Sequence, residues 1–528
     1  MVRRPWLRPL ILLGSTAAGW ILLLLFIDYM DSTRLGTGDD FFIQLSQLSA
    51  GDVQQALGNM PEVVVAILGV AITVISIILQ LSATRYTPRV ADMFFLDKGN
   101  LLVIGFFVVA SIQCIWASLL VHEDFMPRFL VTATLVMMTA AILILIPYFA
   151  YVFAFLNPER IVMRLQDQAL AEALNRRQGS SLELRQDRVL EGIEQLSDVA
   201  VNSISQKDRI IASRAVDALR DLVLSYVKAK DKLPATWFTI HARLRRNPDF
   251  VAMAPARVDQ LSESRTWVEW KVLRQYQTIA NESLNRIREI NQLVAIDTRY
   301  IGEEAIKKGD RAVLGLVVKF FNTYLRASIN STDVRSAYNI LHQYRLLGEG
   351  LLRAGWADEA TEVGGYFKYY GLTANARGIA FINETAAYDL CTLCEVAHLE
   401  GPPEELKLLD DFLDVDNQPE TEAQEQSLRG VRKAQIKLAT FYLQRGEEER
   451  ARRVWRDMEQ EKPERLLSIR QEMIEVTDED FWEVVDRGLN FDYLEPSRRA
   501  ELDRFYSWFP GLAGKFAKTE DLEVPALS

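Results

Sequence analysis

Four long apolar runs dominate the first third of the chain, and short polar stretches separate them. A run of about 18 or more apolar residues is long enough to cross a bilayer as a helix. The runs predict a transmembrane domain over residues 1–156, with helices over about residues 9–30, 61–81, 101–121 and 129–155.

From residue 157 onward the apolar residues recur at the 3.6-residue spacing of amphipathic helices, and strand patterns are scarce. We therefore predict an all-α protein, with a cytoplasmic helical domain over residues 157–297 and a helical-repeat domain with a C-terminal cap over residues 298–528. An apolar stripe predicts one long helix from about Val258 to Val294. Its members are Val272, Tyr276, Ile279, Ser283, Ile287, Ile290 and Val294.

One stretch of the C-terminal part, LATFYLQRGEEERARRVWRDMEQEKP, closely resembles a tetratricopeptide repeat. The residues at the expected offsets are Leu438, Ala439, Tyr442, Gly446, Ala451, Trp455 and Pro463. Weaker copies surround Gly355 and Gly401, so the three turn glycines recur at a longer period than a strict tetratricopeptide repeat. Stacked helical pairs of this kind cover one another's apolar faces and commonly offer a groove to a partner protein.

Charge and cysteine content narrow the functional classes. The formal net charge of −11 argues against nucleic-acid binding, and three cysteines in 528 residues provide no disulfide framework. Most charged residues follow Phe155. Because basic residues stay on the cytoplasmic side, the loop charges predict a multi-pass membrane protein with both termini in the cytoplasm. The basic residues used are Arg3, Arg4, Arg8, Arg85, Arg89, Lys98, Arg160 and Arg164.

The end of the second apolar run carries a distinctive polar stretch, QLSATRYTPR. Pro88 stops the helix, Tyr86 suits the interfacial aromatic belt, and Arg85 and Arg89 reach lipid phosphates. A membrane anchor explains these residues without further chemistry. The alternative is that Gln80 and Arg89 couple the membrane helices to the cytoplasmic part, with Arg89 paired to Asp92 or Asp97.

The segment ILQLSATRYTPRVADMFFLDKGNLLVIGFFV resembles a bacterial family of predicted membrane proteins of unknown function. Members read Q-x-A-S-x-x-F-S-P-R at the end of the second helix, then a short loop ending in an acidic residue and a helix opening V-x-G-x-F. The matching residues here are Gln80, Ser82, Ala83, Tyr86, Thr87, Pro88, Arg89, Asp97, Val103, Gly105 and Phe107. The resemblance implies a multi-pass protein located in the bacterial inner membrane, and it implies no activity.

Polar residues also lie inside the apolar runs. Thr73, Ser76 and Gln80 share one face of the second run, and Gln113 lies in the third. Such residues either form hydrogen bonds that hold neighbouring helices together or line a conduction path. In the first run Gly14, Ser15, Ala18 and Gly19 form two small-x-x-x-small pairs, which predict close packing within the bundle or across a homo-oligomer.

Chemistry-bearing patterns are few. Cys391, Cys394 and His398 share a helical face but lack a second ligand pair, so they are expected to be core residues. His241, Arg243, Arg245 and Arg246 form a small basic patch, either solvated or facing anionic lipid. No phosphate-binding loop, dinucleotide fingerprint or nucleophile elbow occurs, so neither an enzyme nor a cofactor is expected.

These patterns predict an integral membrane protein that presents a cytoplasmic helical-repeat platform. Its expected partners are membrane lipids, a protein bound by the array and a second copy of the chain. The alternative is an oligomeric channel or transporter that the cytoplasmic helices gate or assemble.

Overall fold

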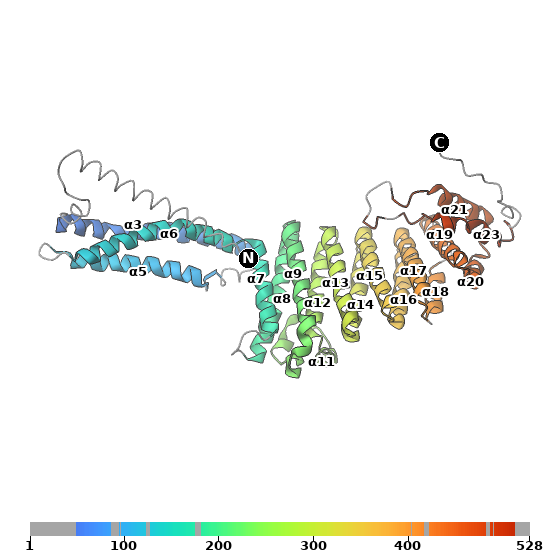
Figure 1. Cartoon of the computed structure of the whole chain (residues 1–528), viewed down its shortest axis with the longest axis horizontal. Helices are drawn as coiled ribbons and strands as arrows, with labels where there is room; N and C mark the ends of the chain where they lie inside the picture. The colour runs from blue at the N-terminus through green and yellow to red at the C-terminus, as the bar shows by residue number, and fades with distance from the viewer. Residues whose placement is uncertain are drawn as a thin grey trace. The chain divides into compact units, whose positions relative to one another are not determined.

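The computed structural model consists of two compact units, Met1–Leu165 and Gln166–Ser528, each described here by itself (Figure 1). In the ranges that the structure describes, regular structure is helical, which confirms the predicted all-α class. The described residues are 49–85, 94–95, 97–122, 127–174, 181–402, 404–416, 422–481, 486–488 and 490–512.

The first unit contains three long apolar helices that pack on one another (Figure 1). They are α3 (Ala50–Arg85), α5 (Lys98–Leu120) and α6 (Arg128–Phe155). Helix α3 begins at Ala50, before the predicted start at residue 61, because the Ser49 hydroxyl caps it by accepting a 3.2 Å hydrogen bond from the Asp52 amide. Pro61 therefore lies inside the helix and does not begin it. The helix predicted over residues 9–30 lies outside the described residues.

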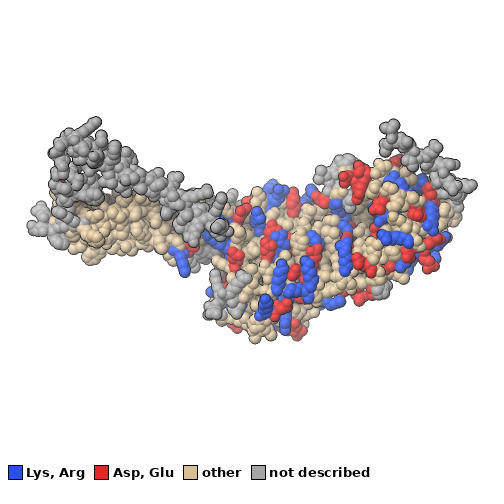
Figure 2. All heavy atoms as spheres, in the orientation of Figure 1, with Lys and Arg blue, Asp and Glu red and all other residues tan. Residues whose placement is uncertain are grey.

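These three helices have the length and composition of membrane spans. Only 22% of the most apolar stretch of each is buried, so large apolar side chains such as Leu102, Trp116 and Phe129 remain exposed. In water such a surface is unfavourable, whereas lipid tails match it. Figure 2 shows the described part of these helices almost free of charged residues, while both signs of charge mix over the second unit.

A fourth helix, α14 (Arg311–Asn330), is also long and apolar enough to cross a membrane. In contrast to the first three, 56% of its most apolar stretch is buried inside the second unit. Its apolar stripe packs on the neighbouring helices α12, α13, α15 and α16. We therefore assign α14 to the array and not to the membrane.

The second unit is an array of helices stacked in two layers. One layer contains α8, α12, α14, α16 and α18, and the other contains α9, α13, α15, α17 and α19. The division between the two units falls within helix α7, and short helices fill the stretch after α9 and the C-terminal end. The bounds are α7 Pro158–Ala173, α8 Leu182–Ser205, α9 Arg209–Ala229, η1 Lys230–Lys232, η2 Ala235–Phe238, η3 Leu244–Arg246, α10 Pro248–Val251, α11 Pro255–Glu263, α12 Trp267–Ser283, α13 Arg288–Lys308, α15 Val334–Arg353, α16 Ala357–Ala376, α17 Ala380–Glu400, α18 Glu405–Leu413, α19 Glu422–Gln444, α20 Glu448–Met458, α21 Pro463–Glu475, α22 Pro496–Arg499 and α23 Leu502–Tyr506.

Most helices of the array end in a residue with left-handed backbone geometry, which closes the last turn. At Gly446, φ is 78°, and the Glu447 amide donates a 2.9 Å hydrogen bond to the Tyr442 carbonyl. The same pattern follows α15 at Gly355. Glycine adopts this conformation without a Cβ clash, so a glycine in the sequence predicts each of these turns.

The single helix predicted from Val258 to Val294 is wrong. The stretch contains α11, α12 and the start of α13, with breaks at Arg265 (φ 59°) and Asn285 (φ 57°). The apolar stripe itself is buried, but it passes through these breaks without a glycine or proline to mark them. At the second break, tertiary structure supplies a partner, because the Asn285 amide donates to the Asp333 carboxylate at 3.0 Å.

The boundary predicted between residues 297 and 298 lies inside α13, which packs on both α9 and α15. Residues on its two sides therefore belong to one continuous array.

Candidate functional site

The polar stretch that ends the second apolar run is only partly described. Arg85 is the last residue of α3, and Gln80 lies on an exposed face of this helix. Tyr86, Pro88 and Arg89 lie outside the described residues, as does the proposed pairing of Arg89.

Asp97, the acidic residue of the resemblance, fixes the start of α5 to the end of α6. Its carboxylate caps α5 by accepting hydrogen bonds from the amides of Gly99 (2.8 Å) and Asn100 (3.4 Å). It also accepts a hydrogen bond from the Tyr151 hydroxyl. Asn100 in turn donates to the Phe94 carbonyl at 3.3 Å and accepts from the Tyr148 hydroxyl at 2.6 Å.

We call these four residues, Asp97, Asn100, Tyr148 and Tyr151, the interface joint. Asn100 and the two tyrosines are not among the residues predicted from the sequence to be functional. A signal was present, because Tyr148 and Tyr151 are three residues apart near the end of an apolar run and thus share a helix face. The joint has the character of a structural brace, since its polar groups bond to one another.

The predicted intramembrane polar residues lie at different places on the helices. Thr73 and Ser76 are exposed on the same side of α3, and the Thr73 hydroxyl donates to the Gly69 carbonyl at 2.8 Å. Gln113 is half-buried on α5. Beside it, the buried Cys114 thiol lies 3.5 Å from the Leu57 carbonyl and so joins α5 to α3.

The residues of the strongest repeat signature lie in α19, α20 and the start of α21. Leu438, Ala439, Tyr442 and Ala451 are buried where α19 and α20 pack together. Gly446 is in the turn between these helices, the half-buried Trp455 lies near Phe509, and Pro463 opens α21. The signature residues thus form the core and turn of one helical pair.

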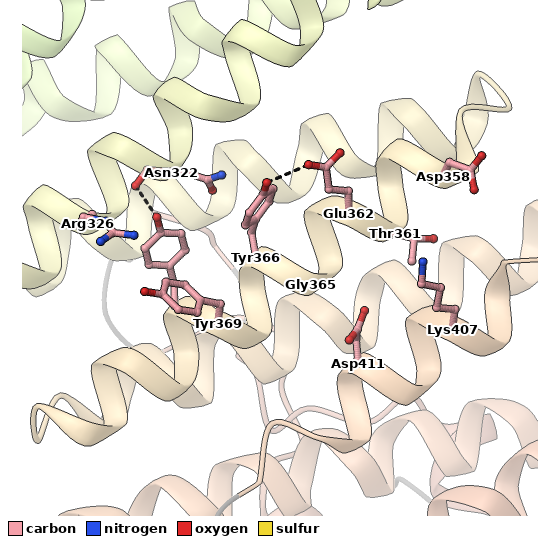
Figure 3. Close-up of a pocket in the computed structure, with 11 residues that line it drawn as sticks. Asn322, Arg326, Asp358, Thr361, Glu362, Gly365, Tyr366, Tyr369, Lys407 and Asp411 are labelled. Carbon is pink, nitrogen blue, oxygen red and sulfur yellow. Dashed lines mark hydrogen bonds between the residues drawn. The ribbon is translucent and has the colours of Figure 1, made fainter.

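The layer of α14, α16 and α18 carries an open groove with a volume of ≈ 620 Å³ (Figure 3). Helix α14 contributes Asn322 and Arg326, and α18 contributes Lys407 and Asp411. The remaining lining comes from α16 and consists of Asp358, Thr361, Glu362, Gly365, Tyr366, Tyr369 and Tyr370. We call this surface the tyrosine groove.

The tyrosine groove is lined by aromatic and charged side chains (Figure 3). The Tyr370 hydroxyl donates to the Asn322 carbonyl at 2.9 Å, and the Tyr366 hydroxyl donates to Glu362 at 2.8 Å. Burial and the hydrogen bond to the nearby Glu362 carboxylate raise the pKa of Tyr366. The Arg326 guanidinium lies 5.9 Å from the centre of the exposed Tyr369 ring. The groove therefore offers aromatic faces beside both signs of charge.

Gly364 allows a close approach of α16 and α18, two of the helices that line this groove. A Cβ at this position would lie 2.3 Å from the Leu408 Cδ1 atom on α18, so only glycine allows α16 and α18 to approach this closely without a shift of Leu408. The neighbouring Gly365 opens directly into the groove.

The cysteine and histidine cluster on α17 is packed into the array. Cys391 and Cys394 are buried, and burial raises the pKa of both thiols well above the usual value. His398 Nδ1 lies 2.9 Å from the Glu405 carboxylate. Among the residues that the structure describes, no cluster of three or more metal-binding side chains occurs.

The basic patch around His241 faces carboxylates. Arg243 pairs with Asp187 at 3.0 Å, and Arg245 pairs with Asp259 at 2.5 Å. His241 Nε2 also lies 3.7 Å from Asp187. These pairs offset much of the positive charge that the sequence suggested.

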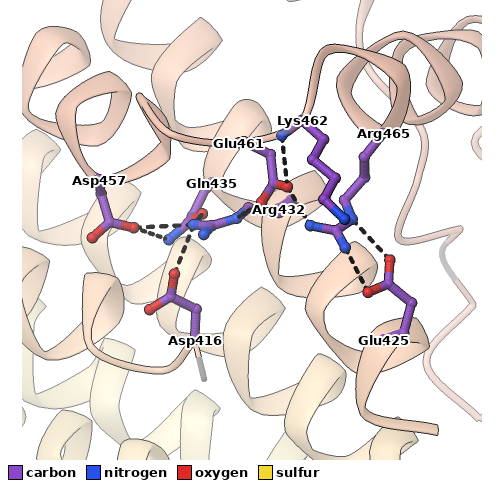
Figure 4. A network of polar contacts seen from close by, with 8 residues as sticks. All are labelled: Asp416, Glu425, Arg432, Gln435, Asp457, Glu461, Lys462 and Arg465. Carbon is purple, nitrogen blue, oxygen red and sulfur yellow. Dashed lines mark hydrogen bonds and ion pairs between the residues drawn. The ribbon is translucent and has the colours of Figure 1, made fainter. Parts of the chain in front are cut away.

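Near the C-terminal end, Arg432 organises a polar network between α19 and its neighbours (Figure 4). Its guanidinium pairs with Asp416 (2.7 Å), Asp457 (3.1 Å) and Glu461 (2.9 Å). Burial raises the pKa of Asp416 to about 6, although Arg432 opposes the rise. The network therefore joins α19 to α20, which carries Asp457, and to Asp416 in the segment after α18.

Residues 3–191 match the family described as "Predicted membrane protein (DUF2254)". No curated protein and no solved structure matches the chain. The family match covers the apolar helices and ends within α8. Together with the exposed apolar surface of α3, α5 and α6, it supports a membrane-associated protein.

Proposed function

We propose that this protein is an integral inner-membrane platform whose helical array binds a segment of a partner protein in the tyrosine groove. The membrane helices keep the array at the cytoplasmic surface of the bilayer. The proposal assigns no catalytic role to either unit.

The observation that carries the proposal is the open groove across α14, α16 and α18. Its volume of ≈ 620 Å³ is enough for several side chains of a bound segment. Tyrosine and arginine are the residue types that most often dominate protein interfaces, because they combine large contact area with directional hydrogen bonds. Tyr369 and Arg326 display both types at the rim, where a partner can reach them.

Site-specific photo-crosslinking in cells tests this proposal. A photoreactive residue at Tyr369 is expected to give a discrete crosslinked protein, and Lys407→Glu is expected to reduce that product at least about tenfold by reversing a groove charge. The matched control is Tyr300 on α13, which is exposed and lies 4.6 Å from the Arg299 guanidinium but outside the groove. Equal crosslinking at Tyr369 and Tyr300 would rule the groove out as the partner site.

A further inference from the structure

The other layer of the array carries a segment of the chain's own C-terminal part. Residues 486–488 and 490–495, which we call the strap, run across α15, α17 and α19 without a helix or strand of their own. Asp486 pairs with Arg335 on α15 through two contacts of 3.2 Å, and Asn339 donates to the same carboxylate at 3.0 Å.

Arg487 of the strap is held in a buried bidentate pair. Its guanidinium donates to the two Asp389 oxygens on α17 at 2.6 and 3.1 Å, and to the Tyr338 carbonyl at 2.7 Å. The guanidinium also lies 4.1 Å from the centre of the Tyr338 ring. A planar, forked cation satisfies all these partners at once, and a lysine does not.

Phe491 and Asp492 form the second contact point of the strap. The Phe491 ring stacks on Tyr388 of α17 at 4.6 Å with an interplanar angle of 11°. Asp492 accepts hydrogen bonds from the Tyr388 hydroxyl at 2.7 Å and from Lys433 of α19 at 2.6 Å. An aromatic side chain followed by a carboxylate therefore fits this point of the surface.

Lys437 recognises the backbone of the strap. Its ammonium donates to the carbonyls of Phe491 (3.2 Å) and Tyr493 (3.0 Å). Because these contacts involve main-chain oxygens, they do not depend on the side chains of Phe491 and Tyr493.

Two of the residues that contact the strap occupy equivalent positions in successive helices of this layer. Tyr388 of α17 and Lys433 of α19 each precede their turn glycine, Gly401 or Gly446, by 13 residues. The strap therefore binds neighbouring helices at one repeated position, in addition to its contacts with α15.

We infer that this face of α15, α17 and α19 is a peptide-recognition surface, and that the strap is its resident ligand. The occupant that replaces the strap is a segment of a partner protein that has the pattern Arg-x-x-x-Phe-Asp and turns as the strap does, where the Tyr493 amide donates to the Asn490 carbonyl at 3.2 Å. Its arginine takes the place of Arg487 against Asp389, and its Phe-Asp pair takes the place of Phe491 and Asp492 against Tyr388 and Lys433. The inference is independent of the tyrosine groove, which lies on the other layer.

A trans-peptide binding experiment on the purified full-length chain tests the inference. The probe is a fluorescent peptide with the sequence of residues 486–499, DRGLNFDYLEPSRR. A strap variant, Phe491→Ala with Asp492→Ala, is expected to bind the probe at least about tenfold more tightly than the wild-type chain, because the strap competes less for the surface. Adding Lys433→Met to this variant is expected to abolish the gain.

Two controls separate binding from damage to the fold. A probe with the same two alanine substitutions is expected to bind at least about tenfold more weakly than the unmodified probe. If the strap variant no longer melts cooperatively, Asp486→Ala replaces it, since the Arg335 partner of Asp486 is half-exposed and the change is mild.

Equal probe binding by the wild-type chain and a folded strap variant would overturn the inference, as would equal binding of the two probes. A strap variant that forms dimers, which the probe converts back to monomers, would assign the surface to the strap of a second copy. That outcome would overturn the assignment to a partner protein.

Discussion

The hydroxyl of Tyr148 on α6 donates a 2.6 Å hydrogen bond to the side-chain oxygen of Asn100 on α5, and both residues are buried. This bond joins helices whose remaining contacts are largely apolar. Tyr148→Phe is expected to lower the free energy of unfolding by about 1–3 kcal/mol, because the amide oxygen loses its donor in a buried place. Denaturation of the detergent-solubilised protein with increasing SDS measures the loss.

A double-mutant cycle with Asn100→Ala isolates this bond. The two changes are expected to be non-additive by about 1 kcal/mol. Thr139→Val on α6 is the control, because the exposed Thr139 hydroxyl bonds only to the Leu135 carbonyl of its own helix among the contacts described. Additive effects of Tyr148→Phe and Asn100→Ala would show that the bond contributes no coupling between α5 and α6.

Ala451 is fully buried where α20 packs on α19, so it has no space for a long or charged side chain. Ala451→Arg is expected to unfold this helical pair, because an unpaired charge in an apolar core is far more costly than the pair's own stability. Limited proteolysis should then cut α19 and α20 much faster than in the wild-type chain. Glu449→Arg, an exposed change on the same helix, should leave the cleavage rate unchanged. Wild-type protease resistance of Ala451→Arg would contradict the described packing.

Glu384 on α17 gives the array a defined pH dependence. Burial, together with the nearby Asp492 carboxylate, raises the pKa of its carboxyl to about 7, although Lys433 opposes the rise. Since the folded pKa lies above the unfolded value, the stabilising contribution is complete below about pH 4.5 and is lost as pH rises through about 7. Glu384→Gln, which stays neutral, is therefore expected to gain stability relative to the wild-type chain by about 2 kcal/mol between pH 5 and pH 8.

Thermal unfolding of both chains at pH 5 and pH 8 measures this difference. Because all other titrating groups are shared, the comparison between the chains isolates Glu384. A constant difference in stability across the two pH values would contradict the raised pKa.

The membrane topology remains a prediction from the loop charges. Reporter fusions at Gly99 and Ser528 are expected to be active in the cytoplasm, and fusions at Gln44 and Glu123 on the opposite side of the membrane. A cytoplasmic C-terminus is essential to the proposed platform, because the array and both of its surfaces precede it in the second unit. Reporter activity of the Ser528 fusion on the outer side would therefore end the proposal in its present form.

The sequence by itself determined the helical class, the apolar runs and several turns. Long runs without charge are stable only when they are buried in lipid or in a large core, so α3, α5 and α6 can be predicted from composition. The turns at Gly355, Gly401 and Gly446 are visible because their backbone has positive φ, which glycine adopts at no steric cost.

Only the tertiary structure decided where other helices end and which polar residues meet. Arg265 and Asn285 adopt positive φ without being glycine, so the breaks around α12 follow from packing and not from local preference. Helix α14 has the composition of a membrane span, and its burial among neighbouring helices decides against that role. Phe491 and Tyr388 are distant in the sequence, and nothing in either local pattern links them. Their contact forms because the C-terminal segment returns over α15, α17 and α19 and brings Phe491 to the exposed side of this layer.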